Sequence, residues 1–218
     1  MTSKGIQTFQ RHQGTVAPLD RANVDTDQII PKQFLKSVKK TGFGVNLFDA
    51  WRFLDEGEIG KQERQENPDF VLNDSRYRNA TILLARRNFG CGSSREHAVW
   101  ALLQFGFRCV LAPSFADIFH NNCISNGLLP VVMDEAWIDQ IFEDATQDEP
   151  LTMTVDLQEQ RISYADGNAT HFSIDPKARR RLMEGMDEIA LTLRHEEQIR
   201  SFEKEHRQRM PWLFSSTG

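Results

Sequence analysis

The residues best suited to chemistry lie in the stretch 88–97, Asn-Phe-Gly-Cys-Gly-Ser-Ser-Arg-Glu-His. It joins an apolar segment at 80–86, which predicts a strand, to an apolar segment at 95–105, which predicts a helix. A turn from strand to helix directs backbone N–H groups and the positive end of the helix dipole toward one point, which favours a carboxylate or a phosphate. Arg95 adds a planar set of donors for the same anions. We therefore predict an anion site with the hydroxyl of Ser93 inside it.

Three familiar motifs do not fit this stretch. Gly90-Cys91-Gly92 begins like a dinucleotide-binding fingerprint, but Arg95 stands where the third glycine belongs. A P-loop needs Gly-Lys-Ser/Thr and a nucleophile elbow needs Gly-x-Ser-x-Gly, and the sequence contains neither. His97 follows Ser93 by four residues and could act as its base, so a stand-alone serine hydrolase stays as an alternative, although no third member or oxyanion apparatus is evident.

Composition limits the class of protein. The 218 residues, of which 39% are hydrophobic and 26% charged, suit a globular protein with one large domain or a domain with appendages. A net charge of −5 argues against a nucleic acid or an anionic membrane surface as partner. The N-terminus shows no signal peptide and no apolar run is long enough to span a bilayer, so we expect a cytoplasmic protein.

The three cysteines, Cys91, Cys109 and Cys123, have no close pairs, which fits a reducing compartment. Their spacing matches no common zinc or iron–sulfur pattern, so no metal site is expected on this chain. Cys109 lies in an apolar strand and Cys123 on the buried stripe of a helix, and both are predicted to be core residues.

Apolar runs and helical patterns alternate along the middle of the chain and predict the elements that position the turn. Strands are expected at 80–86, 108–112 and 128–133, and helices at 95–105 and 114–126. Ser114 is the expected N-cap of the second helix, whose buried stripe would contain Phe115, Ile118 and Phe119. This β-α-β-α-β order predicts a parallel sheet, and ligands of such sheets bind beyond the carboxyl ends of the strands.

The flanking segments predict shorter elements. They are an opening strand at 13–19, a short helix at 47–54, an exposed excursion at 55–69, a helix at 134–145, alternating strands at 152–157, 161–164 and 170–174, a helix opened by Asp175-Pro176, and a last helix at 187–209.

Two stretches of the sequence resemble the markers of the aconitase swivel domain. They are the stretch 88–98 and the stretch 23–31, Asn-Val-Asp-Thr-Asp-Gln-Ile-Ile-Pro. The stretches 41–44, 47–54 and 113–119 are similar to those of 3-isopropylmalate dehydratase small subunits within the same superfamily. The resemblance covers nearly the whole chain. It implies an α/β fold, an aconitase-type swivelling β/β/α domain with a parallel βαβαβ core, a short antiparallel meander and C-terminal helices. It divides the chain into a swivel-like domain, 1–186, and a helical extension, 187–218, that packs on the domain or on a partner.

The resemblance also implies a reaction. Members of this family are small subunits of a heteromeric hydro-lyase that interconverts 2-isopropylmalate and 3-isopropylmalate by dehydration and rehydration in leucine biosynthesis. The 4Fe–4S cluster is carried by the large subunit, none is bound by this chain, and activity requires that large subunit. Alternatives are the small subunit of a related hydratase, of homoaconitate or citramalate type, and a stand-alone anion-binding module.

Site residues follow from position in the two markers. Ser93 matches the catalytic serine, which removes a proton α to a carboxylate as an alkoxide, and Arg95 matches the arginine that binds a substrate carboxylate. Ser94 either bonds the substrate or caps the helix. Thr26 and Asp27 belong to the second marker; Asp27 either orients Arg95 or the serine, or bonds its own backbone as a turn aspartate.

The stretch 32–37 corresponds to the segment that sets the substrate in the superfamily. Phe34 and Leu35 would suit an isopropyl group, whereas Lys32 or Lys36 keeps a more polar substrate open. Glu96 and His97 are expected to stabilise the turn rather than to react.

Overall fold

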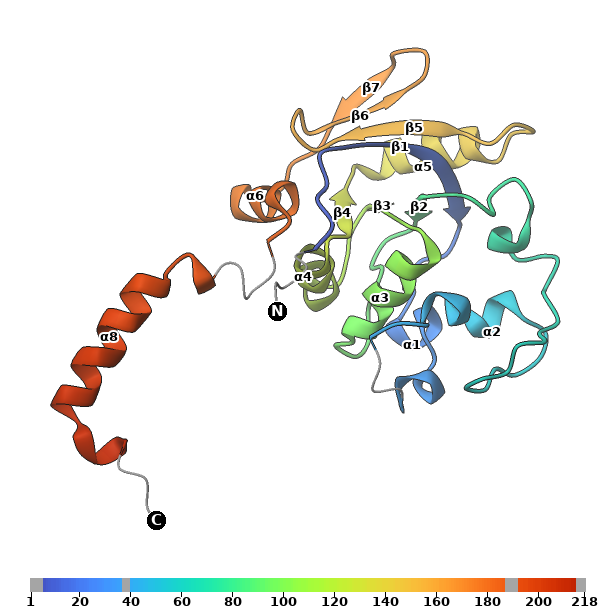
Figure 1. Ribbon diagram of the computed structural model, residues 1–218. Coiled ribbons are helices and arrows are strands. Elements are labelled where there is room, and N and C mark those ends of the chain that lie inside the picture. Colours follow the sequence, from blue (N-terminus) through green and yellow to red (C-terminus); the bar gives the residue numbers. More distant parts are fainter. Residues whose placement is uncertain (1–5, 37–39, 187–191, 215–218) are drawn as a thin grey trace. The chain divides into compact units, whose positions relative to one another are not determined.

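The computed structural model describes residues 6–36, 40–186 and 192–214 (Figure 1). Its contacts divide the chain into two compact units, of which the larger comprises Ile6–Gly185 and the smaller includes the C-terminal residues from Met186 onward. No helix within the described ranges is both long enough and apolar enough to cross a membrane.

Seven strands of the larger unit form one mixed sheet in the order β4-β3-β2-β1-β5-β6-β7 (Figure 1). β1 to β4 pair in parallel, and β5 to β7 form the antiparallel meander predicted from the sequence. The strands are β1 (Arg11–Leu19), β2 (Ile82–Ala85), β3 (Cys109–Ala112), β4 (Leu129–Val132), β5 (Thr152–Asp156), β6 (Arg161–Tyr164) and β7 (Ala169–His171).

The first strand joins the two halves of the sheet. Arg11–Thr15 pairs antiparallel with β5, whereas Val16–Leu19 pairs in parallel with β2. The observed strand is therefore two residues longer than the strand predicted at 13–19. Its N-terminal half pairs with β5, the first strand of the meander. The meander thus extends the sheet that holds the predicted anion site.

Helices cover both faces of the parallel half. The helices are α1 (Thr26–Ile29), α2 (Asp49–Arg52), α3 (Glu96–Phe105), α4 (Asp117–Asn126), α5 (Glu135–Ala145), α6 (Pro176–Glu184) and, in the smaller unit, α8 (Glu196–Arg209). Leu83 and Ala85 of β2 pack in the core that contains α3, and Ile82 and Leu84 pack in the core that contains α5. Because both faces are covered, all four residues of this strand are buried, which explains why the strand is apolar without alternation.

Four short 3₁₀ turns connect these elements: η1 (Lys32–Lys36), η2 (Gly44–Asn46), η3 (Val71–Asn73) and η4 (Pro211–Leu213). Predicted helix ends at Gly106 and Gly127 are confirmed, and Asp175 caps α6 by accepting hydrogen bonds from the backbone N–H groups of Lys177 and Ala178.

The predicted start of the helix that follows β3 is wrong. α4 begins at Asp117 rather than after Ser114, because the Ser114 hydroxyl accepts a hydrogen bond from the backbone N–H of Asn88 at 2.9 Å instead of capping the helix. Ile118 consequently lies outside the buried stripe, with 54% of its surface exposed. The start of the helix predicted at 187–209 lies outside the described residues, since these exclude 187–191. Thr192 and Leu193 are helical, a turn follows at 194–195, and α8 spans Glu196–Arg209.

The helix predicted at 47–54 is shorter in the structure. α2 has only four residues, because Phe48 before it has a left-handed backbone (φ 51°) and Phe53 after it is extended and pairs with Glu66. The following excursion is exposed over most of its length, as predicted.

Candidate functional site

The two stretches singled out in the sequence lie side by side at the carboxyl ends of β1 and β2. Asp25 and Cys91 form a parallel β-bridge. The Val24 carbonyl accepts hydrogen bonds from the backbone N–H groups of Gly90 at 2.8 Å and Cys91 at 3.2 Å, and Thr26 N–H donates to the Cys91 carbonyl at 2.9 Å. This places the turn at the edge of the sheet where the parallel order predicts a ligand site.

Close packing and unusual backbone conformations fix the shape of the turn. A Cβ on Gly90, whose φ is +77°, would lie 2.1 Å from the ring of Phe119, so only glycine fits there. Asn23 and Asn88 both have a left-handed backbone, with φ of 55° and 58°, and their side chains bond to each other at 2.9 Å. Asparagine tolerates a left-handed backbone better than most other residues. The two asparagines are therefore the sequence signal that could have indicated this contact between 23–31 and 88–98.

Ser93 is exposed at the end of this turn. Its carbonyl accepts a hydrogen bond from the Thr26 hydroxyl at 2.8 Å, and Thr26 is 1% exposed. Within the described ranges, the Ser93 hydroxyl has no hydrogen-bond partner. The buried threonine therefore fixes the backbone of Ser93 and leaves its hydroxyl free for a ligand.

Arg95 and Asp27 form an ion pair between the turn and α1. The side chain of Arg95 is 19% exposed and that of Asp27 is 50% exposed, so the pair faces the surface with the guanidinium partly enclosed. Of the alternatives for Asp27, the structure has the one in which it orients Arg95. The turn aspartate is instead Asp25, which caps α1 by accepting from Gln28 N–H at 2.8 Å.

The N-terminus of α3 points its free backbone groups at the same place. Arg95 is the N-cap residue, and no side chain caps this helix, so the capping alternative for Ser94 is wrong. Within the described part of the chain, the backbone N–H groups of Glu96 and His97 have no hydrogen-bond acceptor. Uncapped N–H groups and the helix dipole together favour an anion beside Ser93 and Arg95.

Glu96 and His97 hold the helix in place through their side chains. Glu96 accepts a hydrogen bond from Asn126 of α4 at 2.9 Å. The ring of His97 lies 4.7 Å from that of Trp100 and 5.2 Å from that of Phe43. These contacts agree with a stabilising role for both residues.

Phe34 and Leu35 lie on η1, directly after the second marker. Phe34 is 2% exposed and packs in the core, and Leu35 is half-buried against the same core. In the described residues, no hydrogen bond or ring contact joins either of them to Ser93 or Arg95. Phe34 borders a groove of about 600 Å³ that also contains Phe43, Val45 and Ile59.

The three cysteines lie on three different elements, namely the turn, β3 and α4. Cys109 and Cys123 are fully buried, as predicted for core residues, and burial raises the pKa of both thiols. The Cys91 thiol donates to the Asn23 carbonyl at 3.4 Å, and burial, with a smaller contribution from Asp25, raises its pKa. Among the residues that the structure describes, no group of three His, Cys, Asp or Glu side chains could hold a metal ion.

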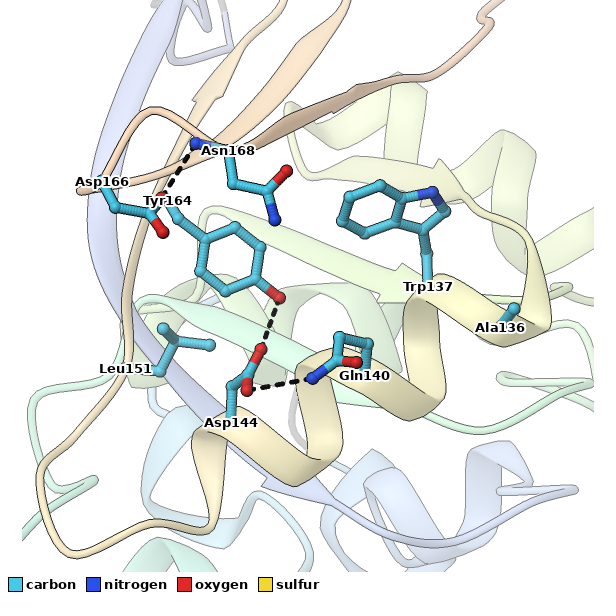
Figure 2. Close-up of a pocket in the computed structure, with 8 residues that line it drawn as sticks. All are labelled: Ala136, Trp137, Gln140, Asp144, Leu151, Tyr164, Asp166 and Asn168. Atoms are coloured by element: carbon cyan, nitrogen blue, oxygen red, sulfur yellow. Dashed lines mark hydrogen bonds between the residues drawn. The ribbon is translucent and has the colours of Figure 1, made fainter.

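A second hollow, of about 610 Å³, lies between α5 and the β6–β7 hairpin (Figure 2). The ring of Tyr164 and the indole of Trp137 border it, and both of its carboxylates are already bonded. Asp144 accepts from the Tyr164 hydroxyl at 2.9 Å and from Gln140 at 3.1 Å, and Asp166 accepts from the backbone N–H of Asn168 at 2.8 Å. The Tyr164 pKa is raised by burial and by Asp144, so the phenol stays protonated. As far as the structure describes the chain, the hollow is lined by two carboxylates and by no Lys or Arg side chain, so it lacks the anion-binding chemistry of the turn.

Comparison with known protein families covers the chain in three pieces. Residues 6–136 match the model of the aconitase C-terminal domain, and residues 188–216 match that of the C-terminal domain of the 3-isopropylmalate dehydratase small subunit. Residues 139–176 match a model described as LeuD_N.

Individual relatives match over nearly their full length. The 3-isopropylmalate dehydratase small subunit of Methylibium petroleiphilum is 57% identical over 210 residues, which cover 95% of this chain and 97% of the relative. That of Marinobacter nauticus is 54% identical over 213 residues, which cover 97% and 99%. A solved structure of 3-isopropylmalate dehydratase (leuD) from Methanocaldococcus jannaschii shares the fold, with a TM-score of 0.59 and 23% identity over 88% of this chain and 99% of that chain.

Proposed function

Because this chain belongs to the family of 3-isopropylmalate dehydratase small subunits, within the aconitase superfamily, we propose that Ser93 and Arg95 form its half of that enzyme's active site. The aconitase-type α/β fold predicted from the sequence is confirmed. The names of the relatives favour the interconversion of 2-isopropylmalate and 3-isopropylmalate, in leucine biosynthesis, over the homoaconitate, citramalate, hydrolase and anion-binding alternatives.

The observation that carries this proposal is the junction of the two markers around the exposed Ser93. Thr26 binds the Ser93 backbone, Asp27 pairs with Arg95, and the uncapped end of α3 faces the same point. A serine is a weak base unless its alkoxide is stabilised. The positive field of Arg95 and of the helix N-terminus favours that alkoxide, which gives Ser93 the character the reaction needs.

In the proposed step, the Ser93 alkoxide takes the proton from the carbon α to a substrate carboxylate and becomes a hydroxyl. The electrons of that C–H bond form a double bond to the neighbouring carbon, whose hydroxyl group leaves with the C–O electron pair as hydroxide. Arg95 holds this carboxylate through its paired donors, and Asp27 fixes the guanidinium. Ser94, exposed next to Ser93, supplies a further hydroxyl to the substrate. For rehydration, Ser93 returns a proton to the neighbouring carbon.

The partner in this proposal is the large subunit, which carries the 4Fe–4S cluster. The cluster, when bound there, supplies a Lewis acid for the substrate hydroxyl. The described residues of this chain do not fit such a cluster, because Cys109 and Cys123 are locked in the core away from the turn. The same proposal takes 1–186 as the domain that carries the site and 187–218 as an extension that packs on that domain or on the large subunit. A biosynthetic enzyme of this kind fits the cytoplasm.

Reconstitution tests the proposal. The full chain and the large subunit from the same source are each assayed alone and then together for isopropylmalate turnover. We expect activity only in the mixture, and Ser93→Ala should lower kcat by about 10²–10⁴-fold, the usual contribution of a positioned base. The control for assembly is that Ser93→Ala still co-purifies with the large subunit. Full activity of the Ser93→Ala complex would remove the assigned role of Ser93.

A further inference from the structure

The groove beside η1 has an apolar floor and two prominent apolar side chains on its walls. It lies between η1, the segment 41–46 and the segment 58–62. Phe34 and Phe43 form its floor and are both 2% exposed, whereas Val45 and Ile59 on its walls are 69% and 61% exposed. Large apolar side chains this open to water, set around a hollow, are typical of a surface that another protein covers.

The wall that carries Ile59 is held rigidly. Arg64 donates to Asp49 at 2.5 Å and to the carboxylate and carbonyl of Asp55 at 2.9 and 2.8 Å, and the side chains of Arg64 and Asp49 are only 7% and 3% exposed. A Cβ on Gly57 would lie 2.5 Å from the Asp49 oxygens, so the wall is packed directly on this pair. A buried ion pair adds little net stability, and it is consistent with a demand for a fixed shape here.

The rim of the groove carries charged side chains. Among the described residues, Lys36, Lys61 and the carboxylate of Glu58 line it. Lys61 is paired with Asp55 at 2.6 Å. Lys36 is exposed and forms no ion pair with the residues that the structure describes. A complementary partner would therefore present a carboxylate to Lys36.

The groove adjoins the proposed active site. η1 begins three residues after the end of α1, the helix whose Asp27 pairs with Arg95. On the other side, the ring of Phe43 in the groove floor contacts the ring of His97, four residues after Ser93. The groove is thus linked to the turn that carries Ser93 through α1 on one side and through His97 on the other.

We propose that this groove is a docking site for the large subunit, which inserts an apolar side chain between Val45 and Ile59 and places a carboxylate on Lys36. The inference rests on the proposed function for the identity of the partner. A substrate molecule alone would leave Val45 and Ile59 in water, and a second copy of this chain, itself carrying Lys36, would bring like charges together.

The test uses the full chain and its large subunit, with Ile59→Asp, Val45→Asp and Lys36→Glu. Dissociation constants for the large subunit are measured directly by biosensor binding, and kcat and KM are measured with the large subunit at saturation. Matched controls place the same charges elsewhere: His171→Asp on the exposed edge of β7 and Lys177→Glu on α6. Circular dichroism and melting temperature verify folding, which substitutions at such exposed positions should leave intact.

We expect Ile59→Asp and Val45→Asp to raise the dissociation constant at least about tenfold, as for a residue near the centre of an interface, and Lys36→Glu to raise it several-fold. The control variants should stay within about twofold, and kcat at saturation should be unchanged in Ile59→Asp and Val45→Asp. Unchanged binding in all three variants overturns the proposal. A raised KM for isopropylmalate with unchanged binding of the large subunit also overturns it, because the groove would then be a substrate pocket. The proposal is overturned as well if the variants change only the self-association of this chain, measured by light scattering.

Direct binding keeps this test separate from that of the proposed function. A wild-type complex that forms but shows no turnover would reject the proposed reaction and leave the docking site standing. A complex that turns over normally with all three variants, at limiting large subunit, would reject the docking site and leave the reaction standing.

Discussion

The hydrogen bond from Thr26 to the Ser93 carbonyl makes a quantitative prediction about catalysis. Thr26→Val keeps the shape of this side chain, which is 1% exposed, and removes the hydroxyl that donates at 2.8 Å. Ser93 is exposed, so its carbonyl can bond to water in the variant, and the cost in unfolding free energy should be only about 1 kcal/mol. For a chain of this size that corresponds to a fall in melting temperature of roughly 2–4 °C.

The effect on turnover should be larger than the effect on stability. Without the bond, the Ser93 backbone is held to α1 only by its neighbours, and a displacement of about 1 Å of a reacting group can cost about 10²-fold in rate. We therefore expect kcat of the complex with the large subunit to fall by about 10–100-fold. KM should change little, because Arg95 and the end of α3 remain in place.

Thr26→Ser is the matched control, because it keeps the hydroxyl and loses only a methyl group. Both variants are assayed for kcat and KM with saturating large subunit, and for stability by urea unfolding. The serine variant should retain most of the wild-type kcat. Equal kcat values for the valine and serine variants would refute the argument that this bond positions the base, whatever their stabilities.

Three other experiments test separate parts of the structure. Asp27→Asn removes the charge that orients Arg95, so KM for isopropylmalate should rise about tenfold, equivalent to about 1.4 kcal/mol, and steady-state kinetics that show an unchanged KM would contradict this. Asp49→Asn leaves the buried Arg64 with one carboxylate partner fewer and should lower the unfolding free energy by about 3 kcal/mol, measured by urea unfolding against the exposed control Asp69→Asn. Burial, and for His12 also Arg108, lowers the pKa of His12 and His120, so the folded state favours their neutral forms. The stability they contribute is complete above the unfolded pKa of about 6.5 and is lost as pH falls below it. Melting temperature should therefore fall between pH 7.5 and 5.5, and less so in a His12→Gln/His120→Gln variant; parallel profiles for the two proteins would exclude these histidines as the cause.

The middle of the fold could be predicted from the sequence because its signals are local. The strands β2, β3 and β4 are buried on both faces, apart from Val132 at the end of β4, and appear as short apolar runs. Their helices end at Gly106 and Gly127, which adopt backbone conformations that other residues disfavour. Alternation of such segments is sufficient to predict a parallel sheet and the edge at which a ligand binds.

The contacts that shape the site could not be predicted in this way, because they join distant residues. Thr26 and Ser93 are 67 positions apart, and Asp27 and Arg95 are 68 positions apart. The pattern of either stretch alone gives no partner for its polar side chains. Ser114 illustrates the resulting error: its hydroxyl can equally cap the following helix or bond a distant amide, and tertiary contact with Asn88 decides.

The contacts that fix the turn and the groove wall within this chain affect how an active site divided between two chains can work. If the base and its metal lie on different chains, the geometry of the reacting groups depends on how two bodies are placed against each other. Here the turn that carries Ser93 is fixed within this chain by Val24, Thr26 and the packing of Gly90 on Phe119. The wall of the groove beside it is fixed by Asp49 and Arg64. Since neither segment needs to become ordered when the large subunit binds, little conformational entropy is lost at that step, and binding can be used to align the two halves. Loosening the contacts that fix the turn should therefore lower kcat at saturating large subunit. Loosening the ion pair that fixes the groove wall should instead raise the concentration of large subunit needed for saturation.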